Sequence, residues 1–319
     1  MTDMLATTID AAAAAAMVNA PSPTDSTGDN ALVSISTRFH LGERDMQDAD
    51  LVLLATDNVF FYAHRNTLLR ESSNRFGGLI GDNSEDTMEE IDVSEPMAGL
   101  DLGAPPSLLV VPYPADVLNV LLHVIYGFPV QRYQPPASVL RAVLPALQVL
   151  GYNIHAFVTP HSELFILYVQ AAAADPLPMY ALAAQYAIEP LAVTISTLTL
   201  SGPLSDITDE LAQQMGPIYL KRLFFLHLGR TDALKRLLLP PPVPHLPAPG
   251  ADCDLDAQKS LARAWALACA YVVVDGRPDS LASSLVPLGA HLRCTLCRRS
   301  MEERVATLVN GWNAIKCTI

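Results

Sequence analysis

Residues 49–76, with the sequence ADLVLLATDNVFFYAHRNTLLRESSNRF, decide the fold. The aliphatic run 51–55 and the aromatic run 59–62 flank Thr56-Asp57-Asn58, which has the composition of a tight turn. This pattern predicts a β-hairpin. After the hairpin, Leu68, Leu69 and Phe76 recur near helical spacing among charged residues, which predicts a helix with one face on the sheet. No residue type in the stretch indicates catalysis.

The order of residues in this stretch follows a known signature. Asp50-Leu51-Val52 precede Phe61, Ala63-His64-Arg65, Leu68, Ser72 and Phe76. This order resembles a BTB/POZ domain of fungal type, whose signature reads acidic-apolar-x-apolar and then F-x-A-H-[KR]-x-x-L-x-x-x-S-x-x-F. The chain matches up to Ser72 and carries its phenylalanine one residue late. The resemblance covers roughly residues 46–157.

The resemblance implies an α/β (α+β) unit, a small sheet flanked by helices, followed by an all-α extension. It implies self-association as a homodimer, with His64 placed in the fold and with Arg65 and Asp50 lining a charged pocket for partners. Some BTB proteins bridge substrates to cullin-type ubiquitin ligases, but the apolar-x-Glu motif usual before the third helix is replaced here by Val111-Pro112-Tyr113. The expected fold signature and partner pocket comprise Asp50, His64, Arg65, Leu68, Ser72 and Phe76.

Composition narrows the class of partner. With 319 residues and 50% hydrophobic residues, the chain has room for a second folded region beside one BTB-like unit. A net charge of -13 argues against direct binding to nucleic acid, and no apolar stretch has the length and flanks of a membrane span. Five widely spaced cysteines favour a reduced compartment, cytoplasmic or nuclear. We therefore expect other proteins as partners.

The chain divides into five expected parts. The composition of residues 1–44 predicts a disordered leader. Within it, apolar and polar residues alternate over 31–38, which could equally form a short strand. Residues 45–157 form the BTB-like unit with an acidic insert at 82–102, and 158–239 form a helical extension. A proline-rich linker is expected at 240–255 and a C-terminal helical hairpin at 256–319.

Two expectations concern individual helices. The helix at 114–126 should end at Gly127 and carry Asp116, Asn119 and His123 on one wet stripe, with His123 at the surface. Further along, the apolar pattern of 208–239 predicts helices that restart at Gly216-Pro217 and break again at Gly229.

The one chemical motif is His291-x-x-Cys294-x-x-Cys297, whose spacing could place three ligands around a metal. A fourth ligand is missing locally, and only folding back could bring it from Cys253, Cys269, Cys317 or His245. The cysteine pair could instead be redox-active at a helix N-terminus, or simply two semi-buried structural thiols. The last alternative is the commonest, so we predict no metal and no cofactor.

These observations predict a protein-interaction adaptor that self-associates through its BTB-like unit and recruits partners through the helical extension; a cullin-type ligase is one assembly that it could serve. No catalytic residue is expected, because the motifs of hydrolases, nucleotide-binding enzymes and metalloproteases are absent from the sequence. One alternative is a transcriptional or chromatin regulator that acts through BTB-mediated assembly. The other is a zinc-binding or thiol redox enzyme that uses Cys294 and Cys297.

Overall fold

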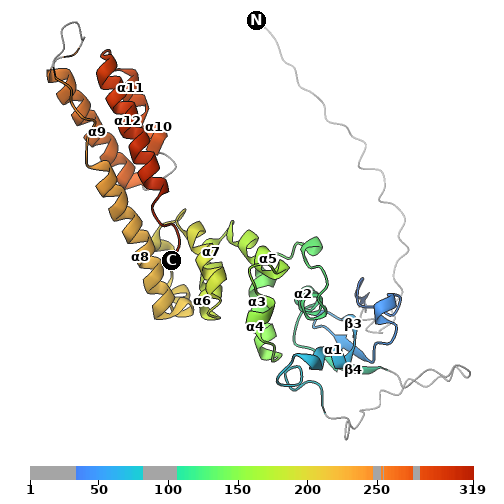
Figure 1. Ribbon diagram of the computed structural model, residues 1–319. Coiled ribbons are helices and arrows are strands. Elements are labelled where there is room, and N and C mark those ends of the chain that lie inside the picture. The colour runs from blue at the N-terminus through green and yellow to red at the C-terminus, as the bar shows by residue number, and fades with distance from the viewer. Residues whose placement is uncertain (1–33, 82–105, 247–252, 254, 276–280) are drawn as a thin grey trace, which may run out of the picture.

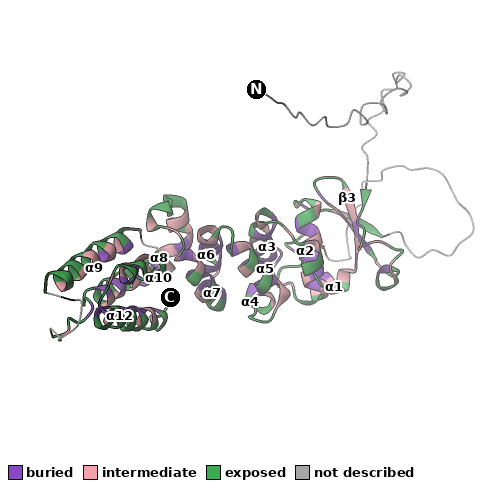
Figure 2. Ribbon diagram, turned by 90° about the horizontal axis from the view of Figure 1, so that it is seen from above, coloured by how far each residue is buried: buried purple, intermediate pink, exposed green. Residues whose placement is uncertain are grey.

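The structure, a computed structural model, describes residues 34–81, 106–246, 253, 255–275 and 281–319 (Figure 1). The described part combines a small mixed sheet with many helices, so the α+β class with a helical part is confirmed. The sheet lies at one end of the molecule, and α8, α9 and α12 lie at the other (Figures 1 and 2). No described helix is both long and apolar enough to cross a membrane. The expected acidic insert at 82–102 lies outside the described residues, as does most of the expected leader.

The sheet has the strand order β1-β3-β2-β4. Strands β2 and β3 pair antiparallel, whereas β4 pairs parallel to β2 and β1 pairs parallel to β3. The strand bounds are β1 Ser34–Ile35, β2 Leu51–Leu54, β3 Val59–Ala63 and β4 Ser107–Val110. The predicted hairpin is therefore confirmed, and it forms the centre of the sheet.

The turn of the hairpin also starts a helix. Asn58 takes a positive φ of 61°, which asparagine tolerates better than most residues. The adjacent Asp57 carboxylate accepts the Ala115 N–H at 3.0 Å. Because Pro114 at the N-cap has no capping side-chain hydrogen bond, Asp57 satisfies one of the unpaired N–H groups of α2.

Helices cover one face of the sheet and then extend away from it. Next to the sheet lie α1 Arg65–Arg70 and α2 Ala115–Tyr126, and α3 Ala137–Val149 packs on the far side of α2 (Figures 1 and 2). The chain continues through α4 Ile154–Phe157, α5 Glu163–Ala172, α6 Pro176–Gln185, α7 Glu189–Thr199 and α8 Asp209–Leu238, with short 3-10 turns at Arg44–Met46, Gln131–Tyr133 and Leu204–Asp206. Gly127 ends α2 in the left-handed conformation, as predicted.

Residues 34–44 are not part of a disordered leader. Ser34 and Ile35 pair with β3, so the strand alternative for this region is confirmed. Phe39 is fully buried, and its ring contacts the rings of Phe61 and His123. The prediction of a disordered leader was therefore wrong for residues 34–44. Phe39 in this stretch supplies an aromatic side chain that the small sheet needs for its core.

The first hydrophobic core is continuous from Phe39 to Leu223. It includes the inward-facing residues of β2 and β3, the buried sides of α2, α3 and α5–α7, and the first part of α8. The boundary expected near residue 158 therefore does not interrupt the core. The sheet region and the helices that follow it share one buried interior.

A second, smaller core lies at the other end. It is built by the last part of α8 together with α9 Leu255–Asp275, α10 Leu281–Leu285, α11 Pro287–Ala290 and α12 Thr295–Asn313. Trp265 of α9 belongs to this core and is 2% exposed. Two long helices, α9 and α12, lie in the region where a hairpin is expected, but α10 and α11 lie between them, so the arrangement is more elaborate than a simple hairpin.

Helix α8 belongs to both cores. Its first part supplies Leu223 to the first core, and Leu234 and Leu238 join the second. The predicted break at Gly216 is confirmed, because this residue has φ 69° and kinks the helix. The break predicted at Gly229 was wrong, since the helix continues through it. Packing on both sides outweighs the cost of one helical glycine, about 1 kcal/mol.

The end of α8 is held by side chains of the second core. Trp265 Nε1 donates to the Leu238 carbonyl at 3.0 Å. The Arg304 guanidinium donates to the Leu237 carbonyl and, through Nε, to the Pro240 carbonyl at 2.8 Å. Carbonyls at a helix C-terminus have no partner within the helix, so these donors satisfy groups that would otherwise be unpaired.

His123 differs most from its predicted environment. It is fully buried rather than at the surface, and its ring contacts Phe128 and Tyr133. Its Nδ1 lies 2.7 Å from the Asn119 carbonyl, so Nδ1 carries the proton. Its Nε2 has no hydrogen-bond partner in the part of the chain that the structure describes. The helical wheel identified the stripe but could not show that Phe39 and Tyr133 cover it.

We predict that Gly151→Ala destabilises the protein far more than Gly127→Ala. Both glycines end a helix at positive φ, +81° and +70°, which costs an alanine roughly 1–2 kcal/mol. At Gly151 a Cβ would also lie 2.2 Å from Asn74 Oδ1, and Asn74 is held by its own hydrogen bond to the Val149 carbonyl. We expect a further loss of about 1–3 kcal/mol there. Equal losses in urea unfolding would contradict this.

We predict that buried His123 makes the fold less stable as the pH falls. Burial lowers the pKa of His123 below its usual 6.5, with Arg132 and Arg38 adding to the shift and Glu163 opposing it. Below pH 6.5 the unfolded chain therefore binds the proton first, and stability is lost as pH falls toward the folded pKa. His123→Phe should flatten this slope in unfolding measured from pH 7.5 to 5. His155→Phe, at an exposed histidine, should keep the wild-type slope; a His123→Phe slope equal to wild type would refute the assignment.

Candidate functional site

The charged residues of the BTB-like signature surround the start of α1. Asp50 Oδ1 accepts the Arg65 backbone N–H at 2.8 Å, and the Arg65 guanidinium donates to Ser107 Oγ at 3.1 Å. Asp50, the residue just before β2, thus acts as a cap for α1. Arg65 links α1 to β4. The two residues lie together, and their contacts form a local structural link between the helix and the sheet.

His64 joins the helix start to α2. The Tyr126 hydroxyl accepts the His64 backbone N–H at 2.7 Å and lies 3.0 Å from His64 Nδ1. On the other side, His64 Nε2 lies 3.2 Å from the exposed Asp48 carboxylate. Burial raises the pKa of Tyr126 to about 12, so this hydroxyl stays protonated. His64 therefore occupies a place in the fold, as the resemblance implied.

The remaining signature residues hold the segment after α1 against α3. Leu68 and Phe76 are fully buried. Ser72 Oγ donates to the Leu150 carbonyl and accepts the Phe76 N–H, each at 2.7 Å. The Tyr152 hydroxyl donates to the Leu68 carbonyl at 2.7 Å. These residues account for the architecture and present no reactive group to solvent.

The face of the sheet that points away from the helices is apolar. Two rows cross the strands in the observed register, Leu108–Val52–Tyr62 and Val110–Leu54–Phe60–Ile35. These seven residues, here called the outer sheet face, are absent from the described hydrophobic cores. Ile35, Leu108 and Val110 are 55%, 54% and 63% exposed. An exposed group of this kind marks an interaction surface.

The sequence carries a signal for this face. The runs LVLL and VFFYA are apolar at every position rather than at alternate positions. Such runs are typical of strands covered on both faces. Among the described residues, helices cover only the inner face, so the second apolar face has no helix packed on it there.

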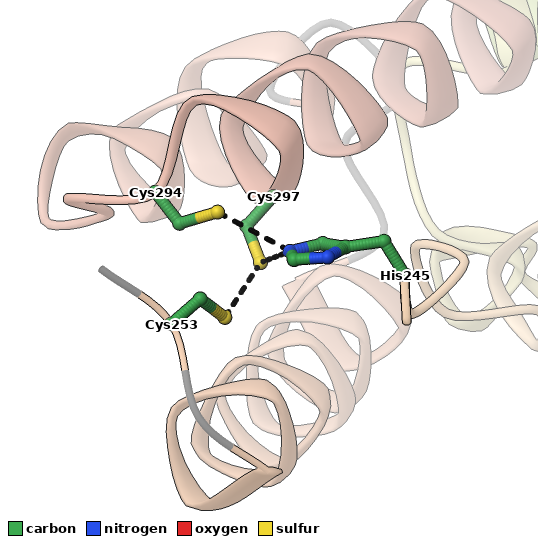
Figure 3. Close-up of side chains that lie close together, drawn as sticks. All are labelled: His245, Cys253, Cys294 and Cys297. Carbon is green, nitrogen blue, oxygen red and sulfur yellow. Dashed lines mark hydrogen bonds between the residues drawn. The ribbon is translucent and has the colours of Figure 1, made fainter. Parts of the chain in front are cut away.

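A second candidate site lies at the start of α12. Cys294 is the N-cap residue of this helix, and Cys297 follows in its first turn. His245 comes from the segment after α8, and Cys253 precedes α9. Figure 3 shows the four side chains converging on one point from these three segments. Their ligand atoms all lie within 4.8 Å of one another.

The distances within this group, here called the Cys/His cluster, are short. His245 Nε2 lies 3.2 Å from Cys294 Sγ and 3.2 Å from Cys297 Sγ. Cys253 Sγ lies 3.4 Å from Cys297 Sγ. A disulfide needs about 2.05 Å between sulfurs, so the cysteines are present as thiols. Cys294 and Cys297 are each 5% exposed.

The two cysteines of the motif differ in acidity. The backbone N–H of Cys297 donates to Cys294 Sγ and is the main reason that the pKa of Cys294 falls to about 7. Burial raises the pKa of Cys297 to about 12, and the neighbouring Cys253 and Cys294 thiols add to this shift. The Leu246 carbonyl, which accepts from Nδ1, raises the pKa of His245. The helix start therefore favours a thiolate at Cys294.

The predicted ligand set is corrected in one member. Cys294 and Cys297 belong to the cluster, but His291 does not. His291 is exposed and lines an adjacent cavity of about 360 Å³ together with Leu288 and Arg293. Its spacing resembled a ligand motif because the sequence shows only local distances. The chain does fold back, and it brings His245 and Cys253 rather than Cys269 or Cys317.

The sequence matches no family model, and neither a curated protein nor a solved structure matches the chain. The two candidate sites are therefore interpreted from their own chemistry. The outer sheet face can bury apolar surface against a protein. The Cys/His cluster can hold a metal ion or exchange electrons as a dithiol.

We predict that Ser72→Ala destabilises the fold by about 1–3 kcal/mol, because it removes a hydrogen bond to the Leu150 carbonyl and leaves the Phe76 N–H without its acceptor. Ser73→Ala is the matched control, since the exposed Ser73 hydroxyl only donates to the Gly151 carbonyl. It should cost less than about 1 kcal/mol. The check is chemical unfolding of both variants, and a larger loss in Ser73→Ala would contradict the assigned role of Ser72.

Proposed function

We propose that the protein is an interaction adaptor that self-associates through its outer sheet face. The observation that carries the proposal is the two apolar rows across the four strands, which no described helix covers. All seven side chains are uncharged, and three are more than half exposed. Their burial in an interface would be favourable by about 25 cal/mol for each Å² removed from water.

A second copy of the chain is the occupant that this face suits. In a two-fold symmetric dimer the same patch serves both subunits, so one uncharged apolar face is sufficient. Two such faces can pack as sheets about 10 Å apart, with their side chains interleaved. The seven side chains carry no charge, so no like charges meet within the face itself.

The fold gives this proposal a second support. The described residues form a small sheet with helices, followed by further helices, which agrees with the arrangement that the resemblance to BTB/POZ domains implies. We therefore keep the BTB-like assignment as part of the proposal. The resemblance also raises membership of a cullin-type ligase, but no residue in the chain favours it.

Recruitment of a second kind of protein is assigned to α8. Ile218, Phe225 and Leu228 lie seven and three residues apart on this helix and are 69%, 65% and 54% exposed. This spacing places them on one side of the helix. Lys221 lies beside the Phe225 ring, at 5.7 Å from its centre, so the stripe has a basic margin. A partner with an apolar, acidic surface fits it.

We predict that the full chain is a dimer in sedimentation velocity and that Val110→Glu makes it monomeric. The charge would have to be buried in the dimer, whereas in the monomer it is solvated on an edge strand. Leu108→Glu should do the same. Ile218→Glu, on the stripe of α8, should leave the dimer intact.

Circular dichroism establishes that each variant is folded before it is compared. A wild-type chain that remains monomeric at tens of micromolar would refute self-association. So would a folded Val110→Glu variant that remains dimeric.

A further inference from the structure

The Cys/His cluster joins His245 and Cys253, which are eight positions apart, to Cys294 and Cys297, which follow more than forty positions later. His245 follows the end of α8, Cys253 lies just before α9, and Cys294 and Cys297 lie at the start of α12. Four potential ligand atoms within 4.8 Å of one another are therefore collected by tertiary folding. The adjacent Cys294-x-x-Cys297 spacing supplies only half of the set.

The observed separations are close to those of a tetrahedral site. With metal–sulfur bonds of about 2.3 Å and a metal–nitrogen bond of about 2.0–2.1 Å, tetrahedral ligands stand about 3.8 Å apart for two sulfurs and about 3.6 Å for sulfur and nitrogen. Three of the separations are 3.2, 3.2 and 3.4 Å, and all four ligand atoms lie within 4.8 Å of one another. These values lie on either side of the tetrahedral ones, so small side-chain adjustments admit an ion.

The imidazole is held in the form that a metal requires. His245 Nδ1 lies 2.9 Å from the Leu246 carbonyl, so Nδ1 carries the proton and Nε2 presents its lone pair to the sulfurs. Such a hydrogen bond on the outer nitrogen is the usual support of a ligating histidine. The Gln258 side chain adds to it, donating to the His245 carbonyl at 2.9 Å and lying 3.7 Å from Cys253 Sγ.

The segment that carries His245 is fixed on α12. Ser300 Oγ donates to the Val243 carbonyl at 2.9 Å, and Arg304 Nε donates to the Pro240 carbonyl at 2.8 Å. The residues before His245 therefore run along the helix that supplies Cys294 and Cys297, although the sequence predicts only a proline-rich linker there. The histidine is placed beside the thiols by contacts independent of the cluster itself.

Zinc is the metal that this donor set selects. Three thiolates with one imidazole in a tetrahedron form one of the usual structural zinc sites. Four protein ligands also fill the coordination sphere, whereas a catalytic zinc keeps one position for water or substrate. A disulfide between Cys253 and Cys297 would need an oxidant. It would also leave the close approach of His245 to Cys294 unexplained.

We propose that His245, Cys253, Cys294 and Cys297 bind one structural zinc ion, which fastens the end of the proline-rich segment to the starts of α9 and α12. On binding, the three thiols give up their protons to solvent and coordinate as thiolates, and the neutral imidazole binds through Nε2. The site then carries a net charge of about -1, and Arg293 lines the same cavity as Cys253, Cys294 and Cys297. No electron transfer is involved.

The first test is the zinc content of the full chain, purified without chelators and measured by elemental mass spectrometry. We expect about one zinc per chain in the wild type. Cys294→Ser and Cys297→Ser should lose most of it. Cys317→Ser, at an exposed cysteine, and His291→Ala, at the histidine of the local motif, are matched controls and should retain it.

The second test does not depend on the stability of the serine variants. His245→Cys changes the ligand set to four thiolates and should still hold zinc, whereas His245→Ala should not. After exchange with cobalt(II), the wild type should show thiolate charge-transfer bands and the visible spectrum of a tetrahedral ion.

Three results would overturn the proposal. The first is a folded wild type with no bound zinc and no tetrahedral cobalt spectrum. The second is iron in place of zinc. The third is zinc that persists undiminished in both Cys294→Ser and His245→Ala.

Discussion

Strand β2 is hydrogen-bonded on both sides, and the rest of the N-terminal core depends on that double pairing. One partner, β3, is its immediate neighbour in the chain, and the other, β4, arrives from residue 107. The pairing with β4 delivers Val111 into the core and sets where α2 begins. Because α2 and its neighbours then lie on one side, no described helix covers the second apolar face of the same strands. The proposed adaptor function follows from this one-sided coverage.

Helix α8 provides the corresponding link between the two cores. Its carbonyls at Leu237 and Leu238 accept hydrogen bonds from Arg304 and Trp265, so the second core is attached to the helix by polar contacts as well as by packing. The residues after α8 then run along α12 and bring His245 to the thiols. Residues 315–319 return to the first core, where the Ile319 N–H donates to Ser196 Oγ. The Cys/His cluster lies beside the smaller core, and a small core is the setting in which a bound metal adds most to stability.

Much of the local structure could be predicted from the sequence. The hairpin at residues 51–63, the left-handed end of α2 at Gly127 and the kink at Gly216 were all correct, because each depends on residues adjacent in the chain. The errors have a common origin. His123 was assigned to the surface and Phe39 to a disordered leader, yet the two rings pack against each other in the core. Neither side chain can be assigned correctly without the other, since they are 84 positions apart.

The sequence by itself determined the elements and half of the Cys/His cluster. Turn residues, helix caps and the spacing of Cys294 and Cys297 act over a few positions, and the backbone geometry of one turn fixes their outcome. Tertiary structure alone decided which sheet face the helices cover and that His245, not His291, meets the thiols. Both depend on the path of the backbone over tens of residues. That path follows from the burial of the whole core, which no local spacing encodes.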